Sequence, residues 1–270
     1  LSATEFPLVP KVEGERTFQI PVDAFKEALS QTLFSVAANE SRPELTGVVF
    51  NFFVFEGEGR VTLASTDSYR LSEKTIPVVS GVTDPFGVVI PAKSLSEINR
   101  ILSVFKDTVD LPSSLGMTLT NSQVVFTYGP VELISRTIEE NYPDYKQIIP
   151  TQFQTQAIID RTDFIKAVKT ASLFSRIGLF DVALTLDPET KTISVSATDA
   201  TRGKNTTQCS ADITGVKNSV TVNFRYLLDG LNAIKADQIV FEMIDASNPC
   251  LVTPKGETSA YRYVVMPIKQ

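Results

Sequence analysis

A short sequence in this chain returns 132 residues later in the same register. Residues 65–70 read STDSYR and residues 197–202 read ATDATR. The same offset of 132 residues aligns Leu95 with Leu227, each near the start of an expected helix. A chance match of one hexapeptide would not keep its register across two loops and a helix start. We therefore predict an internal duplication, which limits the fold to two similar units in tandem.

Hydrophobic periodicity predicts the same order of elements in both copies. The first copy reads as strand 18–22, helix 23–38, strands 48–55, 61–64, 74–79 and 88–91, a helix from about residue 94, and strands 108–111, 116–120, 123–128 and 132–138. The second reads as strand 157–159, helix 161–175, strands 182–186, 193–197 and 220–223, a helix near 227–234, and strands 238–243, 249–253 and 260–267. Ser94 and Glu97 have the spacing of a capping box. The prediction is an α+β fold in which each copy packs two amphipathic helices on antiparallel sheet. We divide the chain into a linker at 1–15 and domains at 16–150 and 151–270.

Composition narrows the classes of function. The chain has 270 residues, 43% of them hydrophobic, and no histidine. The lack of histidine excludes Ser-His-Asp and Cys-His catalysis and most transition-metal sites, and we expect no metal and no cofactor. Cys209 and Cys250 form no disulfide framework. No apolar run is long enough for a membrane helix and no export signal opens the chain, so we expect a cytoplasmic protein. Without an initiator Met, we expect a fragment or a processed product.

The charge distribution is uneven although the net charge is −6. The expected helices hold ten basic residues (Lys26, Lys93, Arg100, Lys106, Arg161, Lys166, Lys169, Arg176, Arg225 and Lys235) and five acidic ones (Asp23, Glu27, Glu97, Asp163 and Asp229). They total +5 and leave −11 for the rest of the chain. One interpretation is the ordinary preference of Lys and Arg for helix ends and solvated faces. The other is a surface that faces nucleic-acid phosphates without reading sequence.

Several blocks in the chain resemble one protein family. They are ESRP with LTG at 40–47, ASTDSYRL at 64–71, IPAKSL at 90–95, ISR at 134–136 with NYPDY at 141–145, FRYLLD at 224–229, SNPC at 247–250 and YVVMP at 263–267. In this order the blocks resemble the bacterial DNA polymerase III β subunit, the DNA sliding clamp. That family has three copies of the domain in each chain, and two are found here. The resemblance implies the second and third clamp domains, with Thr4–Pro7 similar to the segment that joins the first domain to the second.

The resemblance also implies a function. Two full-length chains would form a closed head-to-tail ring whose helices line a hole for duplex DNA. The ring would be a non-catalytic processivity factor that serves replicative and repair DNA polymerases and the clamp loader. The implied DNA-facing residues are Lys26, Arg42, Lys93, Arg100, Lys166, Lys169 and Arg225. Without the first domain, we expect this chain to be monomeric or weakly associated.

A peptide-binding pocket between the two domains is the other implied site. It would take hydrophobic peptides of the Gln-Leu-x-Leu-Phe type from partner proteins. The implied residues are Leu45, Thr66, Ser68, Tyr69, Arg70, Leu71, Pro143, Ile148, Asn223, Tyr226, Pro249, Val264, Val265, Met266, Pro267 and Ile268. Two positions depart from the family pattern: Gln147 replaces a frequent basic residue, and a usual aromatic falls at Leu179 or Phe180.

Other interpretations remain at this point. Asp67 can simply bond the backbone amides of a turn, and its repetition at Asp199 favours that structural role. Tyr69 and Leu71 differ between the copies and are the better candidates for partner binding. A second hypothesis for the protein is an enzyme with a site at Asp67 and Arg70, and a third is a duplicated adaptor without DNA function.

Overall fold

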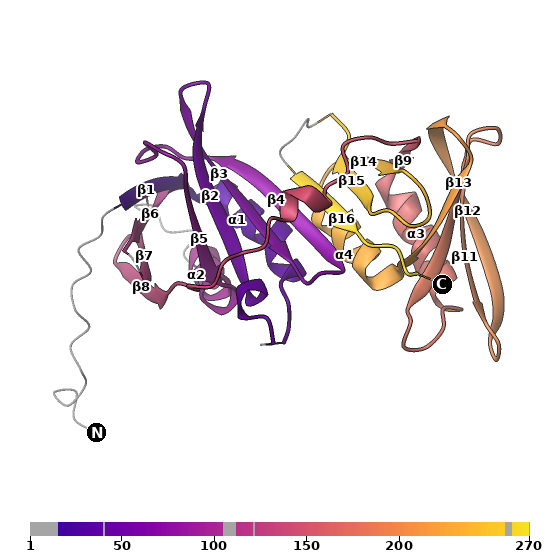
Figure 1. Ribbon diagram of the computed structural model, residues 1–270, viewed down its shortest axis with the longest axis horizontal. Helices are drawn as coiled ribbons and strands as arrows, with labels where there is room; N and C mark the ends of the chain where they lie inside the picture. The colour runs from indigo at the N-terminus through magenta and orange to yellow at the C-terminus, as the bar shows by residue number, and fades with distance from the viewer. Residues whose placement is uncertain (1–15, 40, 105–111, 121, 257–260, 270) are drawn as a thin grey trace.

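Two halves lie side by side along the long axis of the molecule (Figure 1). The computed structural model describes residues 16–39, 41–104, 112–120, 122–256 and 261–269. The predicted linker at 1–15 and the predicted strand at 108–111 lie outside the described residues. No described helix is both long and apolar enough to span a membrane.

The first copy follows the predicted order closely. Its elements are β1 (Arg16–Pro21), α1 (Val22–Thr32), the short 3-10 helices η2 (Leu33–Ser35) and η3 (Pro43–Thr46), β2 (Gly47–Phe55), β3 (Glu58–Thr66), β4 (Arg70–Pro77), β5 (Phe86–Pro91), α2 (Ala92–Val104), β6 (Ser114–Leu119), β7 (Gln123–Tyr128) and β8 (Val131–Arg136). The β2–β3 hairpin turns at Glu56 and Gly57, both with positive φ, which suits a two-residue connection.

The second copy repeats the pattern after a linking 3-10 helix, η4 (Tyr145–Ile148). Its elements are β9 (Thr155–Asp160), α3 (Arg161–Ser172), β10 (Asp181–Asp187), β11 (Thr192–Asp199), β12 (Gly203–Gly215), β13 (Asn218–Asn223), α4 (Phe224–Ala233), β14 (Gln238–Met243), β15 (Cys250–Pro254) and β16 (Tyr261–Val265). Side chains at the N-termini cap both helices: Asp160 accepts from the Asp163 amide at 2.9 Å, and Asn223 accepts from the Arg225 amide at 2.9 Å.

One sheet runs through both copies. Its twelve strands lie in the order β13-β10-β11-β12-β9-β14-β15-β16-β4-β3-β2-β5, and a second sheet of the first copy has the order β1-β6-β7-β8. The copies join where β16 pairs antiparallel with β4, in a register that runs from Tyr261 opposite Lys74 to Val265 opposite Arg70. Through this ladder the sheet of one copy continues directly into the sheet of the other.

The helices of the two copies form one row. α1 contacts both α2 and α4, and α4 contacts α3, so the row continues from one copy to the other. Each copy has its own buried core between helices and sheet, built around Phe25, Phe50 and Phe126 in the first and Phe164 and Phe241 in the second. The predicted α+β fold with two amphipathic helices per copy is confirmed.

Details of the backbone repeat as well. Asp67 accepts hydrogen bonds from the amides of Tyr69 and Arg70, each at 3.0 Å. Asp199 accepts from the amides of the two residues at the same places in the second copy, at 2.9 and 3.1 Å. Gly81 and Gly215 both have positive φ, and a Cβ on either would lie 1.9 Å from a backbone oxygen. These shared contacts support the duplication and the structural role of Asp67.

Three local predictions need correction. The capping box is wrong, because α2 begins at Ala92 directly after β5, and the Ser94 hydroxyl instead lies 2.6 Å from that of Ser135. Glu97 is bonded to Arg100 at 2.6 Å. The first helix ends at Thr32 and not near residue 38, since a 3-10 turn follows it. The long strand β12 was missed, because its Lys, Asn, Thr and Gln residues give little hydrophobic signal.

Gly81 and Gly215, whose backbones pass close to another strand, give a test of the duplicated backbone. Alanine at Gly81 or Gly215 would combine an unfavourable φ with a backbone clash, whereas Gly203 has a similar φ and open space. We expect Gly81→Ala and Gly215→Ala each to lose about 2 kcal/mol more unfolding free energy than Gly203→Ala. Urea unfolding of the three variants measures this difference. Equal losses would show that the close approach does not constrain the fold.

Candidate functional site

The turn between β3 and β4 lies at the junction of the two copies. Besides the two amide bonds to Asp67, the Thr66 hydroxyl donates to the Arg70 carbonyl at 2.6 Å. Ser68 adopts a φ of 76°, a left-handed conformation uncommon for a residue with a side chain. Because these short polar side chains satisfy the backbone groups of the turn, the turn holds Tyr69 exposed and directs Arg70 inward.

Arg70 connects the two copies through charge and ring contacts. Its Nε donates to Asp67 at 2.9 Å, and its Nη1 donates to Asp229 of α4 at 2.5 Å. The guanidinium carbon lies 4.6 Å from the ring centre of Tyr226 and 5.5 Å from that of Phe34. Desolvation by burial would lower the pKa of Arg70, but Tyr263 and the carboxylates of Asp67 and Asp229 raise it above its ordinary value. The charge is therefore retained at the junction.

The C-terminal segment closes one side of the turn. The Met266 amide donates to the Tyr69 carbonyl at 2.9 Å, and the Ile268 amide donates to the Thr221 carbonyl at 2.8 Å. The Tyr69 ring stacks on the Tyr226 ring with centres 6.3 Å apart. The turn of the first copy, the start of α4 and the end of the chain thus meet at one place.

A third hydrophobic cluster lies on the opposite face of the sheet. Leu71 and Val264, opposite each other on β4 and β16, are fully buried there with Tyr145 and Leu251. Ile148 of the linking segment packs against them. In Figure 1 this segment crosses the front of the first copy after β8. Burial raises the pKa of the Tyr145 hydroxyl above its ordinary range, so this hydroxyl stays protonated.

The predicted pocket residues divide into two groups. Five are buried: Leu45, Thr66, Leu71, Val264 and Val265. The others are exposed or half-buried at the surface of the junction: Ser68, Tyr69, Arg70, Pro143, Ile148, Asn223, Tyr226, Pro249, Met266, Pro267 and Ile268. Asn223 caps α4 through two backbone amides, a role the sequence analysis did not foresee. The assignment of these residues to a peptide pocket stays a prediction.

Sequence reasoning missed three partners of Arg70. Phe34, Asp229 and Tyr263 come from segments far from residue 70 along the chain. Asp229 was placed on a helix and counted only as a charge. One signal could have identified it, because Tyr226 and Asp229 lie one helical turn apart and so share a helix face. Without the strand pairing, nothing in the sequence places that face beside β4.

Phe180, one of the two candidates for the aromatic position, lies against a basic side chain. Its backbone has a φ of 54°, and the Arg225 guanidinium carbon lies 3.6 Å from its ring centre. Phe224 meets the same ring edge-on at 6.0 Å between centres. Leu179 beside it is exposed. A basic side chain predicted to face DNA is thus held on an aromatic ring.

The helix row is less basic than predicted. Within the helices as the structure bounds them, seven basic residues stand against five acidic ones. Lys106 lies outside the described residues, and Arg176 and Lys235 follow the ends of α3 and α4. Arg100 is paired with Glu97 and Lys166 with Asp163. Within these bounds the helical excess is +2. Arg176 and Lys235 account for two of the three charges that separate it from the predicted +5, because α3 and α4 end sooner than expected, and the third is Lys106.

The remaining predicted DNA-facing residues are placed as follows. Lys93 and Lys169 are exposed on α2 and α3 and make no ion pair among the described residues. Lys26 of α1 donates to the Leu102 carbonyl at 3.4 Å. Arg42 precedes η3, pairs with Glu44 at 2.9 Å and donates to the Ser68 hydroxyl, so it belongs to the junction and not to the helix row.

Asp67 and Arg70 offer little support for a catalytic site. Asp67 is bonded to two amides and to Arg70, and Arg70 is bonded to two carboxylates. The second copy repeats the turn without the cross-copy partner of Arg70, since Arg202 donates to the Leu173 carbonyl. Among the described residues, no three Asp, Glu or Cys side chains gather in a way that could hold a metal ion. The geometry therefore indicates a joint between domains.

Comparisons with known proteins agree over both copies. The family profile of the DNA polymerase III beta subunit, central domain, matches residues 19–144, and that of its C-terminal domain matches residues 146–269. A beta sliding clamp of Bacillus subtilis is 32% identical over 271 aligned residues, covering 100% of this chain and 68% of the relative. A beta sliding clamp of Staphylococcus aureus is 31% identical over 270 residues with the same coverage.

The fold agrees with a solved structure. The crystal structure of the DNA polymerase sliding clamp from Bacillus subtilis superposes with a TM-score of 0.89 at 30% identity, covering 100% of this chain and 68% of that one. The similarity includes the arrangement of the two copies, because the whole of this chain is superposed.

The contacts of Arg70 predict a difference between the two copies. Arg70→Ala would leave Asp67 and Asp229 without their shared partner, so we expect a loss of about 1–3 kcal/mol in unfolding free energy. Arg202→Ala removes an exposed side chain with one bond to a backbone oxygen and serves as the matched control, with an expected loss within about 0.5 kcal/mol. Urea unfolding measures both. A loss for Arg70→Ala no larger than that for the control would contradict a role in joining the copies.

Proposed function

Because the chain belongs to the DNA polymerase III beta subunit family, we propose that it acts as two domains of a DNA sliding clamp, a non-catalytic processivity factor. In this proposal the first of the two domains spans residues 16–150 and the second spans residues 151–270. The strongest support for this proposal is that one helix row and one sheet continue from the first copy to the second. A ring with helices inside and strands outside needs both layers to continue unbroken between domains.

The helix row would face duplex DNA. Lys93 and Lys169 project from different copies, and Arg225 is held on Phe180. Attraction between such side chains and phosphates is the same at every position along DNA, so it does not oppose sliding. The small helical charge excess suits weak contact in a ring that holds DNA by its topology.

Two strand edges support head-to-tail association in the full-length protein. Inside this chain, β16 of one copy pairs with β4 of the other. In the other copy, β8 corresponds to β16 and the first part of β12 corresponds to β4. Among the described strands, each of them has one side without a partner strand. We infer that a further domain and a second subunit would complete these edges in the same way. This chain by itself is expected to be monomeric, and a cytoplasmic location is part of the proposal.

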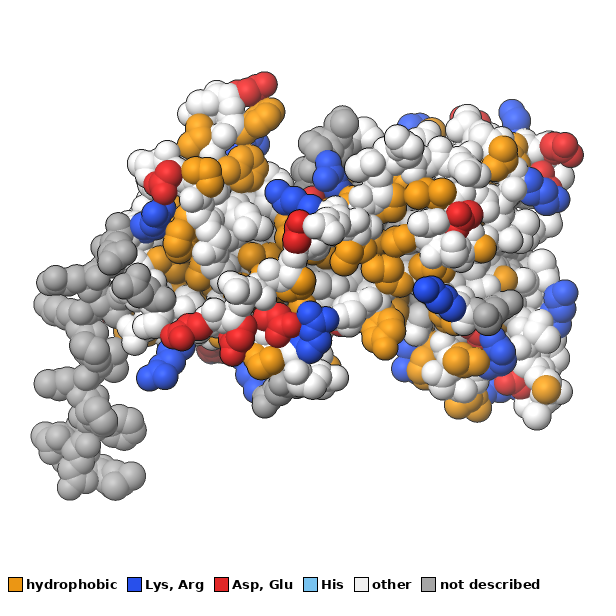
Figure 2. Space-filling model, viewed as in Figure 1, with side chains coloured by type: hydrophobic (Ala, Val, Ile, Leu, Met, Phe, Trp, Pro, Cys, Tyr) orange, Lys and Arg blue, Asp and Glu red, His pale blue; other side chains and the backbone are white. Residues whose placement is uncertain are grey.

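The junction would bind partner peptides from replicative and repair DNA polymerases and from the clamp loader. Figure 2 shows hydrophobic side chains gathered near the middle of this face, where the halves meet. Tyr69, Tyr226 and Met266 offer half-buried or exposed apolar surface beside the charge of Arg70. Met266 can adapt its side chain to different anchors. A hydrophobic peptide with a polar group near its start fits this combination.

Peptide binding tests this site. We expect a Gln-Leu-x-Leu-Phe peptide to bind with a dissociation constant in the micromolar range, and the double change Met266→Ala with Arg70→Ala to abolish binding. Tyr69→Ala should weaken binding about tenfold by removing an aromatic contact. Calorimetric titration measures all three.

Thr201→Ala is the matched control for Tyr69→Ala, because Thr201 has the corresponding place in the second copy. It should leave peptide binding unchanged. Wild-type protein that does not bind the peptide, or binding that survives the Met266→Ala and Arg70→Ala changes, would refute the assignment of the pocket.

DNA binding tests the helix row. Each phosphate contact adds about −0.9 to the slope of log affinity against log salt, so Lys93→Ala with Lys169→Ala should reduce the magnitude of that slope by about two. Fluorescence anisotropy with a short duplex measures it. Lys191→Ala with Lys204→Ala, in the β10–β11 turn and on β12 of the second copy, should leave the slope unchanged. Equal slopes for all proteins would favour an adaptor without DNA function.

A further inference from the structure

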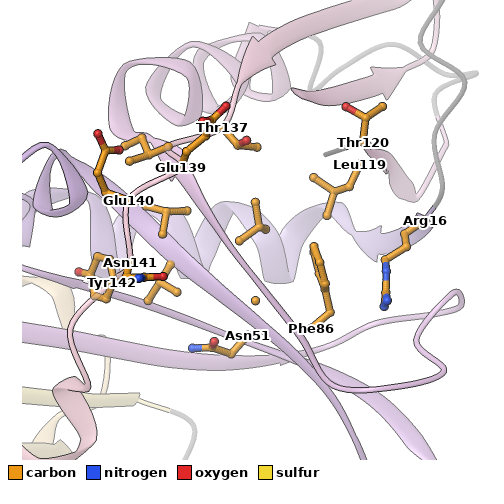
Figure 3. A pocket seen from close by; sticks show the side chains of 15 residues that line it. Arg16, Asn51, Phe86, Leu119, Thr120, Thr137, Glu139, Glu140, Asn141 and Tyr142 are labelled. Carbon is orange, nitrogen blue, oxygen red and sulfur yellow. The ribbon is translucent and has the colours of Figure 1, made fainter. Parts of the chain in front are cut away.

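A groove runs over the outer side of β5 in the first copy. It consists of two adjoining cavities of about 460 and 550 Å³ that share Val49, Asn51, Phe86, Gly87 and Tyr142. Figure 3 shows Phe86 and Arg16 on one side of the first cavity and the segment with Glu139 and Glu140 on the other. Neither cavity is lined by Tyr69, Tyr226 or Met266, and the second extends along the linking segment to Pro143, one of the predicted pocket residues.

The edge of β5 is open along this groove. β5 is the last strand of its sheet and pairs with β2 on one side. On the other side, the Ile138 amide donates to the Val89 carbonyl at 2.9 Å. Backbone groups two residues apart in a strand face the same way, so the amide and carbonyl of Gly87 also face outward. Among the described residues they have no partner, because the chain leaves β5 after Ile138.

The second copy has a corresponding groove. There the Ile268 amide donates to the Thr221 carbonyl at 2.8 Å, and a cavity of about 640 Å³ is lined by Ser219, Thr221 and Ile268. Val89 and Thr221 are again 132 residues apart. The duplication has therefore produced the same opening twice, once at the edge of β5 and once at the edge of β13, the two outermost strands of the sheet.

The charge at the two openings differs. Glu139 and Glu140 follow Ile138, are exposed, and make no ion pair among the described residues. In the second copy Lys269 follows Ile268. Arg16 on the opposite wall is already engaged, with Asp84 at 3.0 Å and with the face of Phe86 at 4.5 Å. The first-copy groove thus has unpaired negative charge beside apolar surface and an open strand edge.

We propose that this groove is a second peptide-binding site, which takes a short extended peptide carrying Lys or Arg on both sides of an apolar segment. The peptide backbone adds as a strand to β5 through Gly87. Its apolar side chain lies against Phe86, and a basic side chain meets Glu139 or Glu140. The site goes beyond the function proposed above and does not depend on the Arg70 junction.

The test uses the pentapeptide acetyl-Lys-Val-Leu-Thr-Lys-amide and its acidic twin, acetyl-Glu-Val-Leu-Thr-Glu-amide. Titration of the isotope-labelled chain, followed by NMR, should show the basic peptide shifting the amide signals of Gly87, Val89 and Ile138. Gly87→Pro removes the outward amide and leaves the β2 ladder intact, so it should abolish the shifts at Val89 and Ile138. Gly87→Ala adds the same Cβ but keeps the amide, and it should retain binding.

A charge reversal completes the test. Glu139→Lys with Glu140→Lys should weaken the basic peptide at least about tenfold and allow the acidic twin to bind. Met266→Ala with Arg70→Ala should change neither result, which separates this site from the junction. The proposal is overturned if millimolar basic peptide leaves the Gly87 signal unmoved, if the shifts lie only at Tyr226 and Met266, or if Gly87→Pro binds as well as Gly87→Ala.

Discussion

The antiparallel pairing of β16 with β4 is the interaction on which the rest of the structure depends. It joins two separately cored copies through a ladder of backbone hydrogen bonds, with Leu71 and Val264 buried on one face and Arg70 and Val265 directed to the other. This backbone pairing fixes the distance between the two strands and the register of one copy against the other. The helix row continues across the joint because the strands beneath it are held in place.

The same joint explains why the proposed binding site lies there. Because the two copies meet edge to edge, the β3–β4 turn of the first copy lies beside the start of α4 and the end of β16 in the second copy. Tyr69 therefore stacks on Tyr226, and Met266 bonds to the Tyr69 carbonyl. These residues are far apart in sequence, and neither copy has this surface without the other. In the second copy the corresponding turn keeps its Asp199 bonds, and Arg202 donates to the Leu173 carbonyl of the same copy.

Much of the fold could be predicted from the sequence, because the signals that carry it are local. Alternation of buried residues predicted β10 and β11, and apolar faces predicted the four helices. The repetition of the Asp67 sequence at Asp199 predicted the duplication. β12 was missed since its residues are mostly polar and pairing with neighbours holds it in the sheet. The capping box failed because a β-strand runs straight into α2. The partners of Arg70 could not be predicted, as they depend on the packing of the two copies. The pocket residues came from family resemblance, which does not distinguish buried Leu71 from exposed Tyr69.

The central claim is that the joint between the copies is the surface that partner peptides recognise. Hydrogen–deuterium exchange of the whole chain, with and without a saturating Gln-Leu-x-Leu-Phe peptide, tests it most directly. We expect slower exchange confined to residues 66–71, 224–229 and 263–268, which come from three distant parts of the sequence and meet only at the joint. Slower exchange confined to one copy, or no change in these three segments when peptide is bound, would contradict it.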